Sequence, residues 1–456
     1  MIYMIKNSKN TGLKPMKKQL LLALSLSIPG AISAYELRWD WATIDTSSLK
    51  FPKGFLWGVA TSEYQNSGAK NCPNNDWAQD DKKFKSGAAC DSFNRVDEDI
   101  ALAQKLGVNS YRLSIEWSLI EPEEGKFDEA VLEHYKVFCD KLIAAGMKVM
   151  ITFHHFTNPV WFAKKGQFEK KENVHYFVRY CVKVFEALKD KVDLWSTINE
   201  PGVYAFQGYV FGDWPPYNHF NFTQAGRVLR NMMRAHVQVY TAIKKISPQA
   251  QIGIVHDIVQ FEPYHNTKPE RNLAYYFNHI FHQAITDFFK TGDFIYEAPT
   301  TRVEYHNPLG AQSLDFIGLN YYSHSLLIAP NPIKPYRSDE IPTDMPYSIY
   351  PEGLYQAIKE VAQLKVPIYI TENGISDGKD DRRELFIKRY IYALSQAIHE
   401  GCDVRGYFYW SLLDNFEWHM GYKQKFGLYE VNMKTFERKL RKGSEYYAQV
   451  IQAHKS

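Results

Sequence analysis

The segment LWSTINEP, residues 194–201, gives the strongest indication of the fold. Its first five residues form a short apolar and β-branched run, which predicts a buried strand that ends close to Glu200. The segment PIYITENG, residues 367–374, repeats this arrangement and places Glu372 at the end of a second such strand. A single glutamate beside Pro or Asn-Gly is most simply a turn residue. A turn is a less convincing explanation for two such glutamates if both strands belong to one closed sheet.

Strand-length runs of this kind recur along the chain, with helical patterns between them. The eight predicted strands span residues 55–61, 110–117, 148–156, 194–199, 251–258, 315–322, 367–371 and 404–412. Strands that alternate with helices indicate a parallel sheet with outer helices, and eight such units form a closed barrel. We therefore predict an α/β fold, a single (β/α)₈ TIM barrel. The alternative is an open doubly wound sheet, whose glycine-rich phosphate fingerprint is absent from the sequence.

Helical spacing of apolar residues predicts the connections between these strands. One helix covers residues 132–143, and the longest covers residues 223–246, with Thr223 as its N-cap and Pro248 beyond its end. His236 within the longest helix is expected to pack in the core and to take no part in catalysis.

A TIM barrel has its active site at the carboxyl ends of its strands, so the fold predicts which side chains meet. Cleavage of a glycosidic bond usually needs two carboxyl groups on opposite sides of one sugar, one to donate a proton and one to attack or to activate water. Both glutamates are expected at this rim. The full predicted set is Gln65, His155, Asn199, Glu200, Asn320, Tyr322, Glu372 and Trp410.

These residues stand in motifs that resemble glycoside hydrolase family 1, the retaining β-glucosidases and β-galactosidases. The resemblance covers residues 51–447, and several separated motifs in one order make it specific. They are FPKGFLWGVATSEYQ (51–65), YRLSIEWSLIEPEEG (111–125), HHF (154–156), TINEP (197–201), GLNYYS (318–323), ITENG (370–374) and YFYWSLLDNFEWHMGY (407–422).

The resemblance implies Glu200 as the general acid/base and Glu372 as the nucleophile. Glu200 must stay protonated near neutral pH, which requires a poorly solvated or negatively charged neighbourhood. Arg112 and Tyr322 are implied to approach Glu372 and to favour its carboxylate. The implied separation of the two carboxyl groups is about 5 to 5.5 Å, the range for direct attack. Asn199 supports this group.

The resemblance also implies a set of sugar-binding side chains, with Trp410 as the aromatic floor beneath the ring. Glu417 carries particular information, because relatives that act on 6-phosphorylated sugars lack a carboxylate there, which would repel a phosphate dianion. Unphosphorylated substrates are therefore expected. The implied binding residues are Gln65, His155, Asn199, Asn320, Trp410, Glu417 and Trp418.

Four places depart from the family pattern. Leu119 and Lys425 stand where the family often has arginine, Thr157-Asn158 replaces a frequent Asp-Leu, and Tyr347 stands where tryptophan is common. None of these changes removes a carboxyl group of the catalytic pair. They affect local packing and the leaving-group side, so the leaving-group preference is not transferred from the family.

The expected activity is therefore that of a retaining β-glycosidase, with β-glucosidase as the preferred assignment. The substrate would be a small β-glycoside or oligosaccharide, cleaved through a covalent glycosyl-enzyme without a metal or an organic cofactor. Two alternatives stay open: a transglycosidase that uses the same intermediate, and an inactive sugar-binding barrel. A metal hydrolase is disfavoured because His154 and His155 are adjacent, without a carboxylate at a convincing ligand spacing.

The first residues predict export. Lys17-Lys18 precede an apolar run at 19–28 and small residues up to Ala34, the order of a secretory signal. We expect residues 1–34 to be the signal peptide, 35–456 to be the catalytic domain, and the mature protein to be secreted or periplasmic without a stable membrane span. A buried or peripheral helix is the alternative, and the polar stretch before Met16 suggests a misplaced start.

Composition excludes little but agrees with this assignment. A formal net charge of +3 gives no general attraction to nucleic acid or anionic membranes, and 15% aromatic residues suit either a carbohydrate site or an ordinary core. Of five cysteines, Cys139 and Cys181 are expected to pack in helices. Cys72 and Cys90 flank a polar loop and could pair after export. The sequence predicts no oligomeric state.

Overall fold

Eight parallel strands close into a barrel, as the sequence predicts. The computed structural model describes residues 37–298, 300–328 and 334–455. The strands follow the order β1-β12-β11-β9-β5-β4-β3-β2, in which the first and last also pair. They are β1 (Leu56–Ala60), β2 (Ser110–Ser114), β3 (Lys148–His154), β4 (Leu194–Asn199), β5 (Ile252–Asp257), β9 (Phe316–Asn320), β11 (Ile368–Asn373) and β12 (Val404–Trp410).

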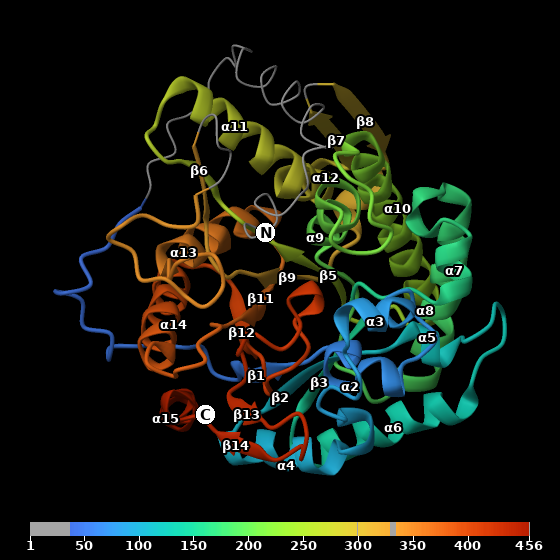
Figure 1. Cartoon of the computed structure of the whole chain (residues 1–456), viewed down its shortest axis with the longest axis horizontal. Helices are drawn as coiled ribbons and strands as arrows, with labels where there is room; N and C mark the ends of the chain where they lie inside the picture. The colour runs from blue at the N-terminus through green and yellow to red at the C-terminus, as the bar shows by residue number, and fades with distance from the viewer. Residues whose placement is uncertain (1–36, 299, 329–333, 456) are drawn as a thin grey trace.

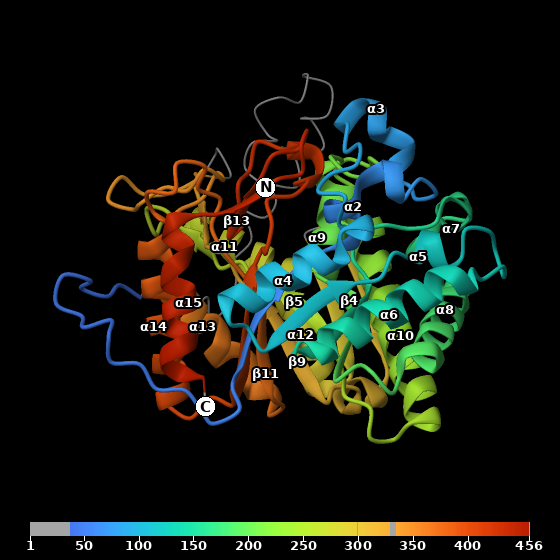
Figure 2. The ribbon, with the colours of Figure 1, turned by 90° about the horizontal axis from the view of Figure 1, so that it is seen from below.

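Helices surround these strands (Figure 1), and α6, α8 and α10 run alongside them in the side view (Figure 2). Short helices and two-stranded sheets decorate the loops. The helices are α2 (Glu63–Asn71), α3 (Asp81–Phe84), α4 (Val96–Leu106), α5 (Trp117–Ile120), α6 (Glu129–Ala144), α7 (Val160–Lys164), α8 (Val174–Leu188), α9 (Pro201–Ala205), α10 (Phe222–Ile246), α11 (Lys268–Asn278), α12 (Ala284–Thr291), α13 (Pro351–Val361), α14 (Arg383–His399) and α15 (Glu445–His454). The remaining strands are β6 (Phe261–Pro263), β7 (Asp293–Ala298), β8 (Thr301–His306), β10 (Ser325–Leu327), β13 (Tyr429–Val431) and β14 (Arg438–Leu440).

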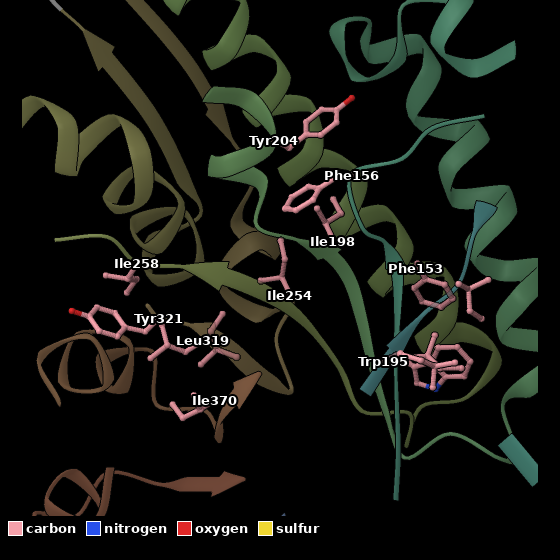
Figure 3. Close-up of a cluster of buried hydrophobic side chains, with 14 of the residues drawn as sticks. Phe153, Phe156, Trp195, Ile198, Tyr204, Ile254, Ile258, Leu319, Tyr321 and Ile370 are labelled. Atoms are coloured by element: carbon pink, nitrogen blue, oxygen red, sulfur yellow. The ribbon is translucent and has the colours of Figure 1, made fainter. Parts of the chain in front are cut away.

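The core has two parts, one on each side of the barrel wall. Outside the wall, strand side chains meet the helices: Trp195 on β4 packs on Phe153 of β3 at 5.0 Å and on Phe185 of α8 at 5.2 Å between ring centroids. Figure 3 shows part of this buried cluster, including Phe153 and Trp195. A smaller cluster consists of Ala60, Met150, Leu194, Phe316, Tyr369, Phe408, Trp410 and Phe426.

Both strands that carry the predicted catalytic glutamates contain a register shift just before the glutamate. On β4, Ser196 pairs with Gly253 and Asn199 with Val255, so β4 has one residue more than β5 over this stretch. On β11, Ile370 pairs with Leu319 and Glu372 with Asn320, which again leaves one residue extra. An extra residue locally changes the face to which the following side chains point. These two bulges therefore change the orientation of the side chains at the ends of β4 and β11.

The structure corrects three local predictions. The N-cap of α10 is Asn221, whose Oδ1 accepts from the backbone N–H of Gln224 at 3.0 Å, whereas Thr223 lies inside the helix. Strand β11 continues to Asn373, so Glu372 lies within the strand and not after it. The predicted strand at residues 110–117 ends at Ser114, because helix α5 begins at Trp117.

Buried polar and sulfur groups fill structural roles as well. His236 is buried between the Thr197 hydroxyl and the Ser313 carbonyl, each 2.7 Å away, which agrees with the predicted packing role. Cys139 and Cys181 are buried in α6 and α8, as predicted, and all five cysteines are free. The pairing considered for Cys72 and Cys90 is therefore not formed.

The predicted signal peptide lies outside the described residues. Within the described ranges, no helix combines the length and the hydropathy that a membrane crossing requires.

Candidate active site

The predicted rim residues gather at the carboxyl ends of the barrel strands. Asn199, Asn320 and Trp410 are the last residues of β4, β9 and β12, and Glu372 is the last but one of β11. His155 and Glu200 directly follow β3 and β4. Gln65 lies in α2 after β1, and Tyr322 lies two residues beyond β9. The topological prediction of one shared rim is confirmed for all eight positions.

Glu200 occupies a strained backbone position between β4 and α9. Its φ is +45° and its ψ is 64°, a left-handed conformation that is costly for a residue other than glycine. Its backbone N–H donates to the Val255 carbonyl at 2.9 Å, which ties this turn to β5. Asn320 Nδ2 donates to Glu200 Oε1 at 2.7 Å. These contacts fix the carboxyl group at the top of the barrel.

Burial raises the pKa of Glu200 well above its ordinary value, and the nearby carboxylates of Asp257 and Glu372 raise it further. The hydrogen bond from Asn320 and the charge of Arg112 oppose this rise without reversing it. The environment therefore favours the protonated form of Glu200.

Glu372 has a different environment, in which both of its oxygens accept hydrogen bonds. The Arg112 guanidinium donates to Oε1 at 2.6 Å, and the Tyr322 hydroxyl donates to Oε2 at 2.7 Å. Arg112 is itself fully buried, and its Nη2 donates to Asn199 Oδ1 at 2.6 Å. A charged hydrogen bond of this kind is among the strongest in proteins and suits an ionised carboxylate.

Glu200 and Glu372 line one cavity of about 170 Å³ together with most of the predicted sugar-binding side chains. Gln65, His155, Trp410, Glu417 and Trp418 are among its walls. The His155 and Trp410 rings are nearly parallel, with centroids 5.9 Å apart. Burial and the neighbouring Glu372 raise the pKa of Glu417 to about 8. The cavity thus combines flat aromatic surfaces with several carboxyl groups.

Polar atoms without partners point to a ligand in this cavity. Gln65 Oε1 and His155 Nδ1 are buried and have no hydrogen-bond partner in the described part of the chain. Unpaired buried polar atoms are uncommon and destabilise a fold unless a ligand or water satisfies them. Both atoms belong to residues predicted to bind sugar hydroxyls.

Asn199 and Asn320 hold side chains of the site in place through hydrogen bonds. Asn199 accepts from Arg112 and from Asn320, and its own amide nitrogen lies 3.4 Å from His155 Nε2. Thr371 in turn donates to Asn320 Oδ1 at 2.7 Å. Neither asparagine belongs to the cavity wall. Direct sugar binding by these two residues stays a prediction.

Sequence reasoning missed Asp257 and Gln207, which also line the cavity. Asp257 is the last residue of β5, so the rule that selected the other strand ends would have selected it too. Gln207 lies in a π-helical segment, Phe206–Phe211, after α9, and its position has no comparable signal in the sequence.

Two of the four departures from the family pattern have defined surroundings. Tyr347 lines the cavity, whereas Thr157 and Asn158 each donate a hydrogen bond to a buried acid. Thr157 donates to Glu116 and Asn158 donates to Asp76, each at 2.8 Å.

Among the described residues, no group of three His, Cys, Asp or Glu side chains is placed to hold a metal ion.

Comparisons with known proteins agree with this geometry. The family model described as Glycosyl hydrolase family 1 matches residues 47–456. Beta-glucosidase A of Thermotoga maritima is 34% identical over 441 residues, which cover 88% of this chain and 98% of that protein. A 6-phospho-beta-galactosidase of Clostridium acetobutylicum is 30% identical over 463 residues, which cover 88% and 96%. A solved beta-glucosidase from Thermotoga maritima in complex with glucoimidazole has a TM-score of 0.81 at 31% identity, covering 88% of this chain and 99% of that chain.

The match extends over nearly the whole barrel and includes relatives above 30% identity along almost their entire length. The family that the sequence motifs resemble is therefore the correct one. The chain belongs to glycosyl hydrolase family 1, a family of retaining glycosidases, and is a glycoside hydrolase that acts on O-glycosyl bonds.

Proposed function

We propose that this glycosidase is a β-glucosidase for unphosphorylated β-D-glucosides, with Glu200 as general acid/base and Glu372 as nucleophile. The observation that carries the assignment of roles is the contrast between the two carboxyl groups. Glu372 accepts from a buried arginine and a tyrosine, whereas Glu200 accepts from a neutral amide and is surrounded by negative charge. Environments that separate two carboxyl groups in this way assign the acid and the nucleophile.

The reaction then proceeds in two displacements. Glu372 attacks the anomeric carbon while Glu200 donates its proton to the departing oxygen, and the bond to the leaving group breaks. A covalent glycosyl-enzyme on Glu372 and an ionised Glu200 remain. Glu200 next removes a proton from water, which attacks the same carbon and releases Glu372. Transfer to an alcohol or a second sugar would use the same intermediate.

The charge of the cavity supports an unphosphorylated sugar, although one relative is named for a 6-phosphorylated substrate. Glu417 is one of four carboxyl groups on the cavity wall, with Glu200, Asp257 and Glu372. None of the described residues that line the cavity is lysine or arginine. A phosphate dianion would lose its hydration here without gaining a cationic partner, which is unfavourable.

We expect kcat/KM for an aryl β-glucoside to exceed that for its 6-phosphate by at least about tenfold, because burial of the unpaired dianion opposes binding. Steady-state rates with the two chromogenic substrates measure this ratio. Glu417→Gln serves as the matched variant and should reduce the ratio. A wild-type preference for the 6-phosphate would contradict the substrate assignment while leaving the catalytic pair intact.

A second prediction concerns pH. The alkaline limb of the kcat/KM profile should report Glu200, which must be protonated to act as an acid. Burial and the charge of Glu372 raise the pKa of Asp257 as well, so Asp257 gains its negative charge only as the pH rises. Asp257→Asn removes this charge, which raises the pKa of Glu200, so the pKa of Glu200 should fall and the alkaline limb should move to lower pH. Profiles of wild type and variant with one aryl glucoside test this. An unchanged limb, or a shift to higher pH, would contradict the assignment of Glu200.

Export remains part of the proposal, because the signal-like residues 17–34 support it on sequence grounds alone. The location of the mature protein would be secreted or periplasmic.

A further inference from the structure

The first described residues pack against the outside of the barrel. Residues 37–46 lie before residue 47, at which the match to the family model begins, so they stand outside the part of the chain that the family model describes. This segment, at the blue end of the described chain, runs beside α13 and α14 (Figure 1) and contacts both helices. We call residues 37–46 the strap.

A buried carboxyl group of α13 anchors the strap. Glu352 Oε1 accepts from the backbone N–H of Trp39 at 3.0 Å and from the indole N–H of Trp41 at 2.9 Å. Both tryptophan rings also meet Tyr392 of α14 edge-on, with centroids 5.7 and 5.8 Å away. Glu352 is only 3% exposed, so loss of the strap would remove two donors from a buried acid, which is unfavourable. The strap is therefore a packed part of the structure.

Arg38 of the strap begins a row of alternating charges that reaches the cavity. Its Nη2 donates to Glu340 Oε1 at 2.8 Å, and the same oxygen lies 3.3 Å from His324 Nε2. His324 Nδ1 in turn lies 2.9 Å from Glu262 Oε2 on β6. Burial opposes a charge on His324, but hydrogen bonds to both glutamates outweigh it and raise the pKa of His324 to about 9. As a cation, His324 can donate to both glutamates at once.

Glu340 stands at the base of a loop, residues 341–349, whose tip belongs to the cavity wall. The Ile349 N–H donates to the Ile341 carbonyl at 2.8 Å and closes this base. His324 lines the same cavity. The tip residues on the wall are Met345, Pro346 and Tyr347. The base of the loop is thus joined to the strap by one ion pair and to the barrel by His324.

We propose that the strap sets the position of the loop at residues 341–349 from outside the barrel, with Arg38 as a positioning residue that acts through Glu340. The described strap residues bind Glu340, Glu352 and the rings of α14, and neither Glu200 nor Glu372. The effect should therefore fall on the fit of the bound substrate and not on the breaking of the bond. The inference goes beyond the proposed function, because it holds for whichever β-glycoside the enzyme cleaves.

The first test separates KM from kcat, with the aryl β-glycoside that wild type cleaves best and with active sites counted by titration. Arg38→Gln should raise KM by about threefold or more and change kcat by less than about twofold, a size expected for coupling through a few contacts. The loop should stay attached, because Arg382 still donates to the Pro342 carbonyl at 2.7 Å. Arg38→Lys keeps the charge beside Glu340 and should recover most of the lost affinity.

Hydrogen exchange reports on the loop directly and needs no turnover. In Arg38→Gln, peptides that cover residues 341–349 should exchange faster, whereas peptides that cover β4 should be unchanged. Lys50→Gln is the matched control: it removes the same charge four residues beyond the strap, where backbone atoms of Lys50 make the contact with Ser395. It should alter neither KM nor the exchange of the loop.

A double-mutant cycle tests the route through Glu340. Arg38→Gln should raise KM much less in a Glu340→Gln background than in wild type, because the partner of Arg38 has already lost its charge. Full additivity would overturn the inference. A lower Tm of Arg38→Gln with unchanged KM and unchanged loop exchange would overturn it too, since the strap would then only stabilise the fold. Neither result bears on the proposed β-glucosidase function, which fails only if wild type cleaves no β-glucoside.

Discussion

Glu372→Gln is expected to lower kcat on aryl β-glucosides by on the order of 10⁵-fold, equivalent to about 7 kcal/mol of lost transition-state stabilisation. The amide is too weak a nucleophile to form the glycosyl-enzyme. It can still accept a hydrogen bond from Arg112, which otherwise donates to Glu372 Oε1 at 2.6 Å, so the fold should survive. Stopped assays on purified variant, together with its thermal unfolding curve, measure both effects.

Glu372→Ala offers an independent control for the same prediction. It opens space beneath the anomeric carbon, so azide should enter and restore cleavage of an activated aryl glucoside. Because azide attacks from the face that Glu372 occupies, the product should be the α-glycosyl azide. Full activity of Glu372→Gln, or a β-azide from Glu372→Ala, would show that another group is the nucleophile.

Glu200→Gln should produce a loss that depends on the leaving group. Substrates with poor leaving groups need proton donation, so their kcat/KM should fall by about 10²- to 10⁴-fold. Dinitrophenyl glucosides leave without protonation, so formation of their glycosyl-enzyme should be nearly unaffected. Pre-steady-state rates across a series of phenols measure this dependence as a slope. An equal loss for good and poor leaving groups would contradict the role of Glu200 as acid.

Much of the fold follows from local sequence patterns. Most barrel strands are short segments rich in apolar residues, and all eight are found within a few residues of their predicted bounds. Strand ends in a parallel barrel share one rim, which is why Glu200 and Glu372 could be brought together without coordinates. The separation of their carboxyl groups, expected at about 5 to 5.5 Å for retention, stays a prediction.

The features that the sequence did not reveal depend on pairing between distant strands. Strands β4 and β11 each contain one extra residue, before Asn199 and before Glu372. It is extra only relative to the paired strand, so no local sequence pattern predicts it. The same holds for Gln207, which reaches the cavity through a π-helical segment. Asp257 differs, because it ends a correctly predicted strand and was overlooked among the motif residues.

The cap of α10 shows a smaller ambiguity of the same kind. Asn221 and Thr223 are both residue types that cap helices, and sequence alone does not decide which hydroxyl or amide faces the first turn. In the structure the Thr223 hydroxyl donates to Thr301 on β8 at 2.8 Å, a contact between residues far apart in the chain. Tertiary pairing thus decides a feature that looks local.

The central step of the proposed mechanism is covalent attack by Glu372 on the anomeric carbon, with Glu200 protonating the leaving group. Incubation with 2,4-dinitrophenyl 2-deoxy-2-fluoro-β-D-glucoside, followed by proteolysis and tandem mass spectrometry, tests this directly. We expect one glycosylated peptide that spans residues 367–374, with the sugar on Glu372. Attachment to Glu200, Asp257 or Glu417, or prompt inactivation without any glycosylated peptide, would contradict it.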